Sequence, residues 1–216
     1  MKKLYFVLLI GIFLSSPGIL SAQVKQNYGS VKVLKGQTRL NLKYDFTELM
    51  VGRPISVITD HKSWIRSEYD YIRTNKEALN KKNPGEGNRW AFNWTEDRVS
   101  RFQPNFEKAF NKITERYKLL AKEYSLDAKY TLVIHTTYIE VLLNEYDPPR
   151  TNAIITLEIT LKETSNPSNI LATIEMKNIR GEGLWGYDYE QGERIESCYT
   201  EAGKQLGNFI AKNGLK

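Results

Sequence analysis

The stretch TNAIITLEITLKETSNPSNILATIEMK, residues 151–177, contains the clearest secondary-structure pattern in this chain of 216 residues. Apolar and polar residues alternate over 152–161 and again over 170–176, which is typical of strands with one buried face. The intervening KETSNPSN is too long for a two-residue turn and predicts a longer hairpin-type loop. The expected inward-facing residues are Ala153, Ile155, Leu157, Ile159, Leu161, Ile170, Ala172, Ile174 and Met176.

The segments before this hairpin predict two further strands. Alternation over 40–44 predicts the first, and KYTLVIHTTYIEVLL, residues 129–143, predicts the second. Past Thr136 the apolar side chains change from even to odd positions, so we expect a β-bulge or a two-sided environment there. Residues 23–30 are interpreted as a loose lead-in, and ELMVGRPISVI, residues 48–58, as a loop or a short edge strand.

Three amphipathic helices are expected, because apolar residues recur at three- and four-residue steps in three segments. The first covers residues 60–79, with Asp60 as its N-cap. The second covers 102–124 and has Pro104 in its first turn, where a missing N–H costs nothing. Residues 80–90 between them predict a crossing loop. The third helix covers 195–210 and places Cys198 on its inward face.

Together these elements predict one α+β domain over residues 23–216. Its expected architecture is a mainly antiparallel sheet of about four strands, with two or three helices packed on one face. A chain of this length can bury one good hydrophobic core.

The first 22 residues have the features of a secretory signal peptide. Lys2 and Lys3 precede an apolar run over 4–14, and Ser21 and Ala22 form a small-residue cleavage site. The run is too short to span a bilayer, although an uncleaved membrane anchor stays open as an alternative. No cysteine lies near the cleavage site, so lipid attachment of the bacterial lipoprotein kind is not expected. We therefore predict a periplasmic or secreted protein, with no transmembrane segment once the leader is removed.

Charge and cysteine content exclude several classes of protein. The formal net charge is +6, and loss of Lys2 and Lys3 lowers it by two. This balance is too mild to predict binding to nucleic acid. The single cysteine, Cys198, cannot form an internal disulfide, and we expect it to be a buried and inert thiol.

No motif predicts catalytic, cofactor-binding or metal-binding residues. The GEGLWG segment, residues 181–186, is interrupted by Leu184 and Trp185 and is followed by acids that would repel phosphate. His61 and His135 have no second ligand at metal-binding spacing. A nucleophile elbow of the G-x-S-x-G type is also missing from the sequence.

Two groups of aromatic residues are the candidate binding sites. The first group lies in RWAFNWTED, residues 89–97, which is interpreted as a loop, and the second begins within GEGLWG and continues to residue 189. Both could be packed against the sheet, or they could be exposed and bind a ligand or partner. The candidate residues are Trp90, Phe92, Trp94, Trp185, Tyr187 and Tyr189.

The order of the predicted elements after the signal peptide resembles that of known envelope proteins. The helix over 102–124, the strands over 130–143, 152–161 and 170–176, and the ending ERIESCYTEAGKQLGNFI resemble secreted uncharacterised proteins of Gram-negative envelopes. More distantly, this order looks like the amino-terminal α/β domain of TolB and of several outer-membrane accessory lipoproteins. The resemblance implies a non-enzymatic role in the envelope, although the lipid-attachment cysteine of the lipoproteins is missing here.

The leading functional hypothesis is a non-enzymatic protein that binds another envelope component, either a protein or a polysaccharide. The alternative is a glycan- or small-ligand-binding module that uses the aromatic candidates. A hydrolase is the third hypothesis, and it would need a cleft that joins a histidine to two carboxylates.

Overall fold

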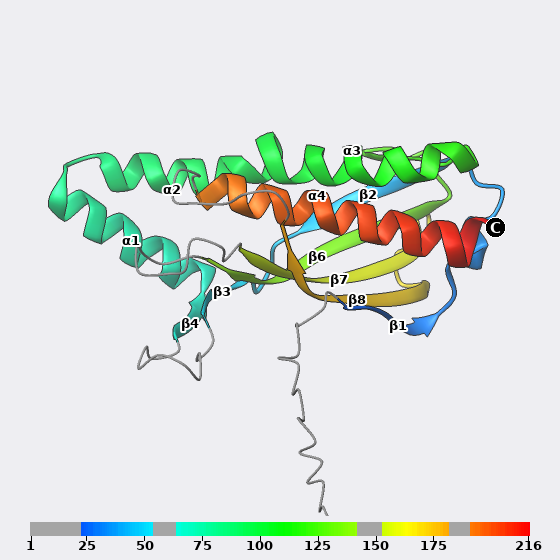
Figure 1. Ribbon diagram of the computed structural model, residues 1–216, viewed down its shortest axis with the longest axis horizontal. Coiled ribbons are helices and arrows are strands. Elements are labelled where there is room, and N and C mark those ends of the chain that lie inside the picture. The colour runs from blue at the N-terminus through cyan, green and yellow to red at the C-terminus, as the bar shows by residue number, and fades with distance from the viewer. Residues whose placement is uncertain (1–22, 54–63, 142–152, 182–190) are drawn as a thin grey trace, which may run out of the picture.

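The computed structural model describes residues 23–53, 64–141, 153–181 and 191–216. The predicted signal peptide, Asp60, His61 and the aromatic candidates Trp185, Tyr187 and Tyr189 lie outside these ranges. All strands of the described residues belong to one sheet, in which β1-β8-β7-β6-β2-β5 are neighbours and β3 pairs with β4 and β6 (Figure 1).

The strands are β1 (Gln23–Gly29), β2 (Arg39–Asp45), β3 (Met50–Arg53), β4 (Trp64–Ser67), β5 (Leu120–Glu123), β6 (Tyr130–Glu140), β7 (Ile154–Glu163) and β8 (Ile170–Arg180). The α-helices are α1 (Glu68–Lys82), α2 (Glu86–Asp97), α3 (Gln103–Thr114) and α4 (Gln191–Ile210). Short helical segments are η1 (Val31–Leu34), η2 (Arg98–Phe102), η3 (Glu115–Tyr117) and η4 (Ala211–Leu215).

The sheet differs from the predicted one in strand number and in strand direction. It has eight strands instead of about four, and it is mixed instead of mainly antiparallel. Strand β2 pairs in parallel with β5 and β6, and β3 pairs in parallel with β6. Parallel neighbours need a long crossover connection, and the helices α1, α2 and α3 supply it between β2 and β6. The predicted lead-in is in fact β1, which pairs antiparallel with β8.

The hairpin predicted over residues 151–177 is confirmed. Strands β7 and β8 pair antiparallel, and most of the residues expected to face inward are buried. Ile170 is 45% exposed instead, because the β7–β8 register shifts between Leu161 and Lys162. The bulge in β6 is also confirmed, since its register with β7 shifts between Thr136 and Tyr138.

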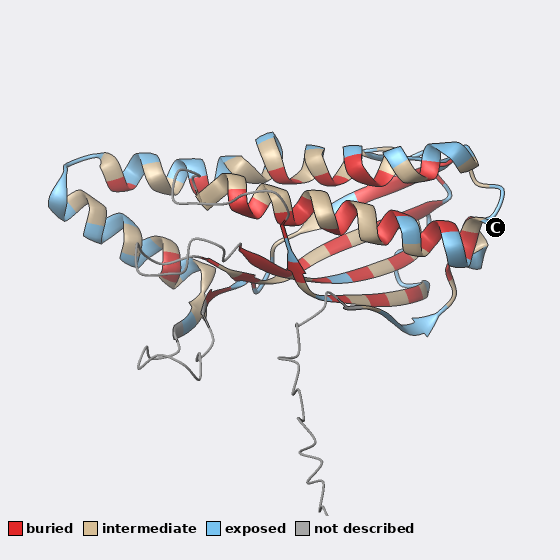
Figure 2. Cartoon of the chain, in the orientation of Figure 1, coloured by how far each residue is buried: buried red, intermediate tan, exposed pale blue. Residues whose placement is uncertain are grey.

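Helices α3 and α4 lie side by side across one face of the sheet, while α1 and α2 form a hairpin that extends past its end (Figure 1). Figure 2 shows buried positions on the inner sides of α3 and α4 and along the central strands. The predicted stripe of the last helix is confirmed by the buried residues Ile195, Cys198, Tyr199, Ala202, Leu206 and Ile210. In the part of the chain that the structure describes, no helix is long and apolar enough to cross a membrane.

Two predicted helix boundaries are wrong. Helix α1 begins after Ser67, whose hydroxyl oxygen accepts a hydrogen bond from the Asp70 amide at 3.2 Å, and residues 64–67 form β4. The predicted helix over 102–124 ends early, because Lys118 takes a left-handed conformation with φ of 63° and the chain then enters β5. Pro104 does lie in the first turn of α3, as predicted.

Small residues bring α3 and α4 into close contact. A Cβ atom at Gly203 would overlap the Phe106 carbonyl oxygen and lie 3.1 Å from the Ala109 Cβ. A Cβ atom at Gly207 would lie 3.2 Å from the Phe110 carbonyl oxygen. The helix layer therefore depends on glycine at Gly203, whereas a side chain at Gly207 would require a shift of a few tenths of an ångström.

One buried polar pair joins the helix layer to the sheet. The Thr136 and Tyr199 hydroxyls are 2.6 Å apart, and both residues are fully buried. The Tyr199 ring also stacks on Phe102, with ring centroids 5.0 Å apart. Burial raises the pKa of Tyr199 above its ordinary range, so the hydroxyl stays protonated. Each hydroxyl thus satisfies the other in a site that water does not reach.

Removing only one of these hydroxyls is expected to destabilise the protein. Thr136→Val or Tyr199→Phe leaves a buried hydroxyl without a partner, which costs about 1–3 kcal/mol of unfolding free energy. The double variant removes both hydroxyls and is expected to be closer to wild type than the sum of the single variants. Urea unfolding of the four proteins measures this coupling, and additive losses would contradict it.

Candidate functional site

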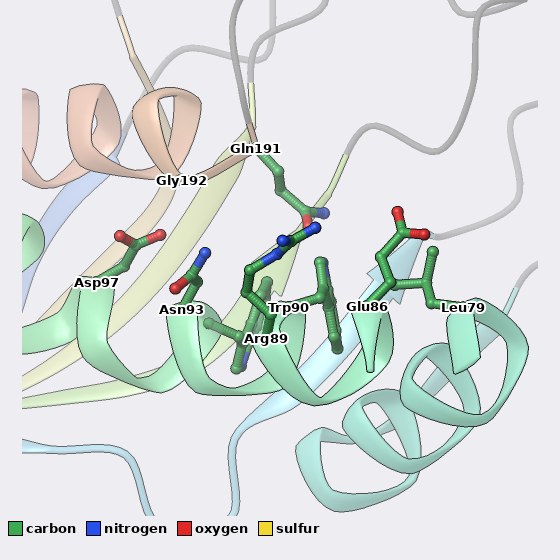
Figure 3. Close-up of a pocket in the computed structure, with 9 residues that line it drawn as sticks. Leu79, Glu86, Arg89, Trp90, Asn93, Asp97, Gln191 and Gly192 are labelled. Atoms are coloured by element: carbon green, nitrogen blue, oxygen red, sulfur yellow. The ribbon is translucent and has the colours of Figure 1, made fainter. Parts of the chain in front are cut away.

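A cavity of about 340 Å³ lies between the α1–α2 hairpin and the start of α4. Asp97, Asn93 and Arg89 project from α2 toward the first residues of α4 (Figure 3). The lining residues are Leu79, Glu86, Arg89, Trp90, Asn93, Trp94, Asp97, Gln191 and Gly192. The volume falls within the range of small-molecule sites.

The aromatic wall of this cavity is held by packing between α1 and α2. Trp90 and Trp94 are one turn apart on α2 and stack with ring centroids 5.8 Å apart. Tyr71 of α1 contacts both rings, at centroid distances of 5.7 and 5.0 Å. A Cβ atom at Gly87 would overlap the Lys76 carbonyl oxygen, so glycine permits the close approach of the two helices.

Polar bonds fix the orientation of these rings. The Trp94 indole N–H donates to Glu68 Oε1 at 2.6 Å, and the same carboxylate pairs with Arg98. Gln191 Nε2 donates to the Tyr71 hydroxyl oxygen at 3.0 Å. Burial raises the pKa of Tyr71 to about 12, so this hydroxyl is neutral at physiological pH. The aromatic wall is therefore preorganised before any ligand arrives.

The charges around the cavity nearly offset one another. Glu86 and Asp97 contribute carboxylates, whereas Arg89 contributes a guanidinium group. Asp97 also forms an ion pair with Arg101 at 3.0 Å, and its carboxylate lies against the backbone of Gly192 in the first turn of α4. A helix N-terminus is partly positive and favours such a carboxylate. The cavity consequently suits a polar ligand without a strong net charge.

The structure places the three described aromatic candidates in different environments. Trp90 is half-buried and lines the cavity, and Trp94, which is 7% exposed, lines it as well. Phe92 is 63% exposed and is not part of the lining. The predicted loop over 89–97 is wrong, because these residues belong to α2. The four-residue spacing of Trp90 and Trp94 was the available helical signal.

Sequence reasoning missed the polar members of the site. Asn93 and Asp97 follow Trp90 at three- and seven-residue steps, so a helical interpretation would have placed them on its side of α2. Gln191 and Gly192 come from the start of α4, far along the chain. Only the tertiary fold brings Gln191 and Gly192 close to α2, and no local sequence pattern predicts that they lie there.

The candidate reactive groups are engaged in structural contacts. The Cys198 thiol donates to the Ala153 carbonyl oxygen at 3.0 Å, and burial raises its pKa to about 12. His135 Nε2 lies 2.8 Å from the Thr47 carbonyl oxygen, on a strand that does not line the cavity. Within the described ranges, no group of three His, Cys, Asp or Glu side chains is placed to hold a metal ion.

Comparison with known proteins gives no family for this chain. No family model and no curated protein matches the sequence. Among solved structures, a leucine-to-methionine variant of PelC from Paraburkholderia phytofirmans matches with 8% identity and a TM-score of 0.36. PelC itself from the same organism matches with 9% identity and a TM-score of 0.36. Both are described as dodecamers, and each match covers 87% of this chain and 98% of the other. Likeness at this level carries no argument about function.

Proposed function

We propose that this protein is a non-catalytic protein of the cell envelope, and that it binds a neutral sugar unit of a polysaccharide in the cavity between α1, α2 and α4. The observation that carries the proposal is the half-buried Trp90 ring set among Asn93, Gln191 and Arg89 in one cavity. The envelope location is supported by the predicted signal peptide.

The chemistry of a sugar matches both kinds of lining group. The apolar C–H face of a pyranose packs against an aromatic ring, while its hydroxyls need donors and acceptors around the edge. Asn93 offers an amide group, Gln191 offers a second amide N–H besides the one that it donates to Tyr71, and Arg89 offers a planar set of donors. Because the charges of the lining nearly offset one another, a neutral sugar fits this site better than a strongly charged one.

A second candidate function is contact with a partner protein. Phe92 is 63% exposed on α2, and Val99 is 55% exposed on the following turn. These side chains do not line the cavity, and exposed apolar groups of this size are common at protein interfaces. This hypothesis predicts that Phe92 matters for binding and that Trp90 does not.

The test compares Trp90→Ala with Phe92→Ala. Wild type is titrated with neutral disaccharides of glucose, galactose and N-acetylglucosamine, with tryptophan fluorescence and calorimetry as readouts. Loss of the stacking surface in Trp90→Ala is expected to weaken binding at least tenfold, which corresponds to about 1.4 kcal/mol. Phe92→Ala is the matched control and is expected to bind within twofold of wild type.

A third variant keeps the result interpretable if Trp90→Ala disturbs the packing with Tyr71. Asn93→Ala removes one exposed polar group of the lining and leaves the aromatic wall in place, and it is also expected to weaken binding. The proposal fails if none of the sugars binds folded wild-type protein, or if Trp90→Ala and Asn93→Ala both bind as wild type does.

A further inference from the structure

A second cavity lies between α3 and α4, separate from the site described above. Its volume is about 200 Å³. The lining residues are Asn105, Lys108, Ala109, Lys112, Thr200 and Lys204. Nothing in the lining is shared with the aromatic cavity, which lies toward the other end of the helix layer.

The close packing of the two helices shapes this groove. Gly203 lets α4 approach the backbone of α3 at Phe106, and Ala109 adds only a methyl group beside the contact. Ala109 and Thr200 therefore leave a shallow floor of small side chains between the helices. The longer lysine side chains stand around this floor.

Three lysines give the groove a concentrated positive charge. Lys108 and Lys112 are one turn apart on α3, where like charges repel each other. Within the part of the chain that the structure describes, neither has a carboxylate at ion-pair distance. Lys204 faces them from α4, and its ammonium group lies 3.2 Å from Glu201.

The other polar groups of the lining are already engaged. The Asn105 amide donates to Glu196 Oε1 at 2.9 Å and to the Arg101 carbonyl oxygen at 3.0 Å. The Thr200 hydroxyl donates to the Glu196 carbonyl oxygen at 3.1 Å. New donors for a ligand must therefore come mainly from Lys108 and Lys112, because Lys204 already pairs with Glu201, and these donors are cationic.

We propose that the α3–α4 groove is a binding site for an oxyanion, either the carboxylate of an acidic sugar or a phosphate group. An oxyanion between Lys108, Lys112 and Lys204 would relieve the repulsion between the first two and accept hydrogen bonds from ammonium groups on both helices. Carboxylate and phosphate share this chemistry, and the experiment distinguishes them.

The test uses a charge-matched pair of double variants. Lys108→Gln with Lys112→Gln removes two charges from the groove, and Lys76→Gln with Lys81→Gln removes two charges from exposed positions on α1. Inorganic phosphate and glucuronate are the probes, and glucose is the neutral counterpart of glucuronate. Binding is followed by amide NMR shifts, with Thr200 and Lys204 as reporters.

At least one of the two anions is expected to shift the reporters in wild type, whereas glucose leaves them unchanged. The groove variant is expected to lose at least tenfold in affinity, and the α1 variant to stay within twofold. The anion that binds more tightly identifies the source of the oxyanion. Trp90→Ala is expected to keep this affinity, because the two sites are separate.

Three results would overturn the inference. The first is a wild-type protein in which neither anion shifts the reporters. The second is an equal loss of affinity in both double variants, which would reveal a response to net charge alone. The third is loss of anion binding in Trp90→Ala, because the groove would then not be an independent site.

Discussion

Folded protein is expected to leave Cys198 unmodified during hours of exposure to an aromatic disulfide reagent at pH 8, whereas unfolded protein reacts with one equivalent within minutes. The thiol is 0% exposed and is the only cysteine in the chain. Thiol exchange requires both access to the sulfur and the thiolate form. The folded state restricts both.

The slow reaction of folded protein follows from the low thiolate fraction of Cys198 and from its burial. Burial raises the pKa of Cys198 to about 12, so on the order of 10³-fold less thiolate is present at pH 8 than for an ordinary thiol. Exclusion of the reagent slows the reaction further, because modification must wait for an opening of the α4 region.

Absorbance of the released aromatic thiol measures this reaction directly. Protein in urea is the positive control, and intermediate urea concentrations are expected to give rates that follow the unfolded fraction. Prompt stoichiometric reaction of the folded protein would contradict both the position of α4 and the assignment of Cys198 as a packing residue.

Gly203→Leu is expected to be the most destabilising single substitution in the helix layer. The first added atom already overlaps the Phe106 carbonyl oxygen, and backbone cannot move aside as a flexible side chain can. Overpacking of a well-packed core costs about 1–3 kcal/mol, and contact with backbone places this site at or above the upper value. Helices α3 and α4 must separate to make room for the new side chain.

Asn208→Leu is the matched control for this substitution. It introduces the same side chain on the same helix, at a residue that is exposed. Urea or thermal unfolding is expected to show a large loss for Gly203→Leu and little change for Asn208→Leu. Equal stability of the two variants would show that α3 and α4 do not pack through Gly203.

The parts of the fold that the sequence predicts are those whose side chains alternate between core and solvent. The pattern over 155–161 indicates β7, because each inward residue is apolar and the residues between them are polar. The terminal helix is equally readable, because Ile195, Cys198 and Leu206 fall on one side of it. In both segments, local periodicity and burial agree.

In the elements that the sequence did not predict, local periodicity and burial disagree. Strand β1 has exposed residues at most of its positions, so it has no apolar pattern to detect. Leu120 and Tyr124 continue the spacing of the preceding helix by coincidence, although both are exposed. The turn at Lys118 that separates them from α3 needs a left-handed backbone that no glycine signals there. The parallel pairings of β6 depend on long-range contacts alone.

The candidate site was predictable only in part, because it too depends on long-range contacts. Large aromatic residues drew attention to Trp90, Phe92 and Trp94, but only the structure separates the cavity-lining rings from the exposed one. Lys108 and Lys112 of α3 have no sequence pattern that distinguishes them from the many other charged residues of the chain. Their grouping with Lys204 exists only because α3 and α4 lie together.

The pairing of β1 with β8 has a consequence for how the chain matures. During synthesis the first strand emerges long before its partner, so it must remain extended and unpaired while nearly the whole sheet is still to be made. Long-range closures of this kind make folding slow. A nascent chain of this protein therefore cannot complete its sheet until β8 has left the ribosome, when most of the chain has already been made.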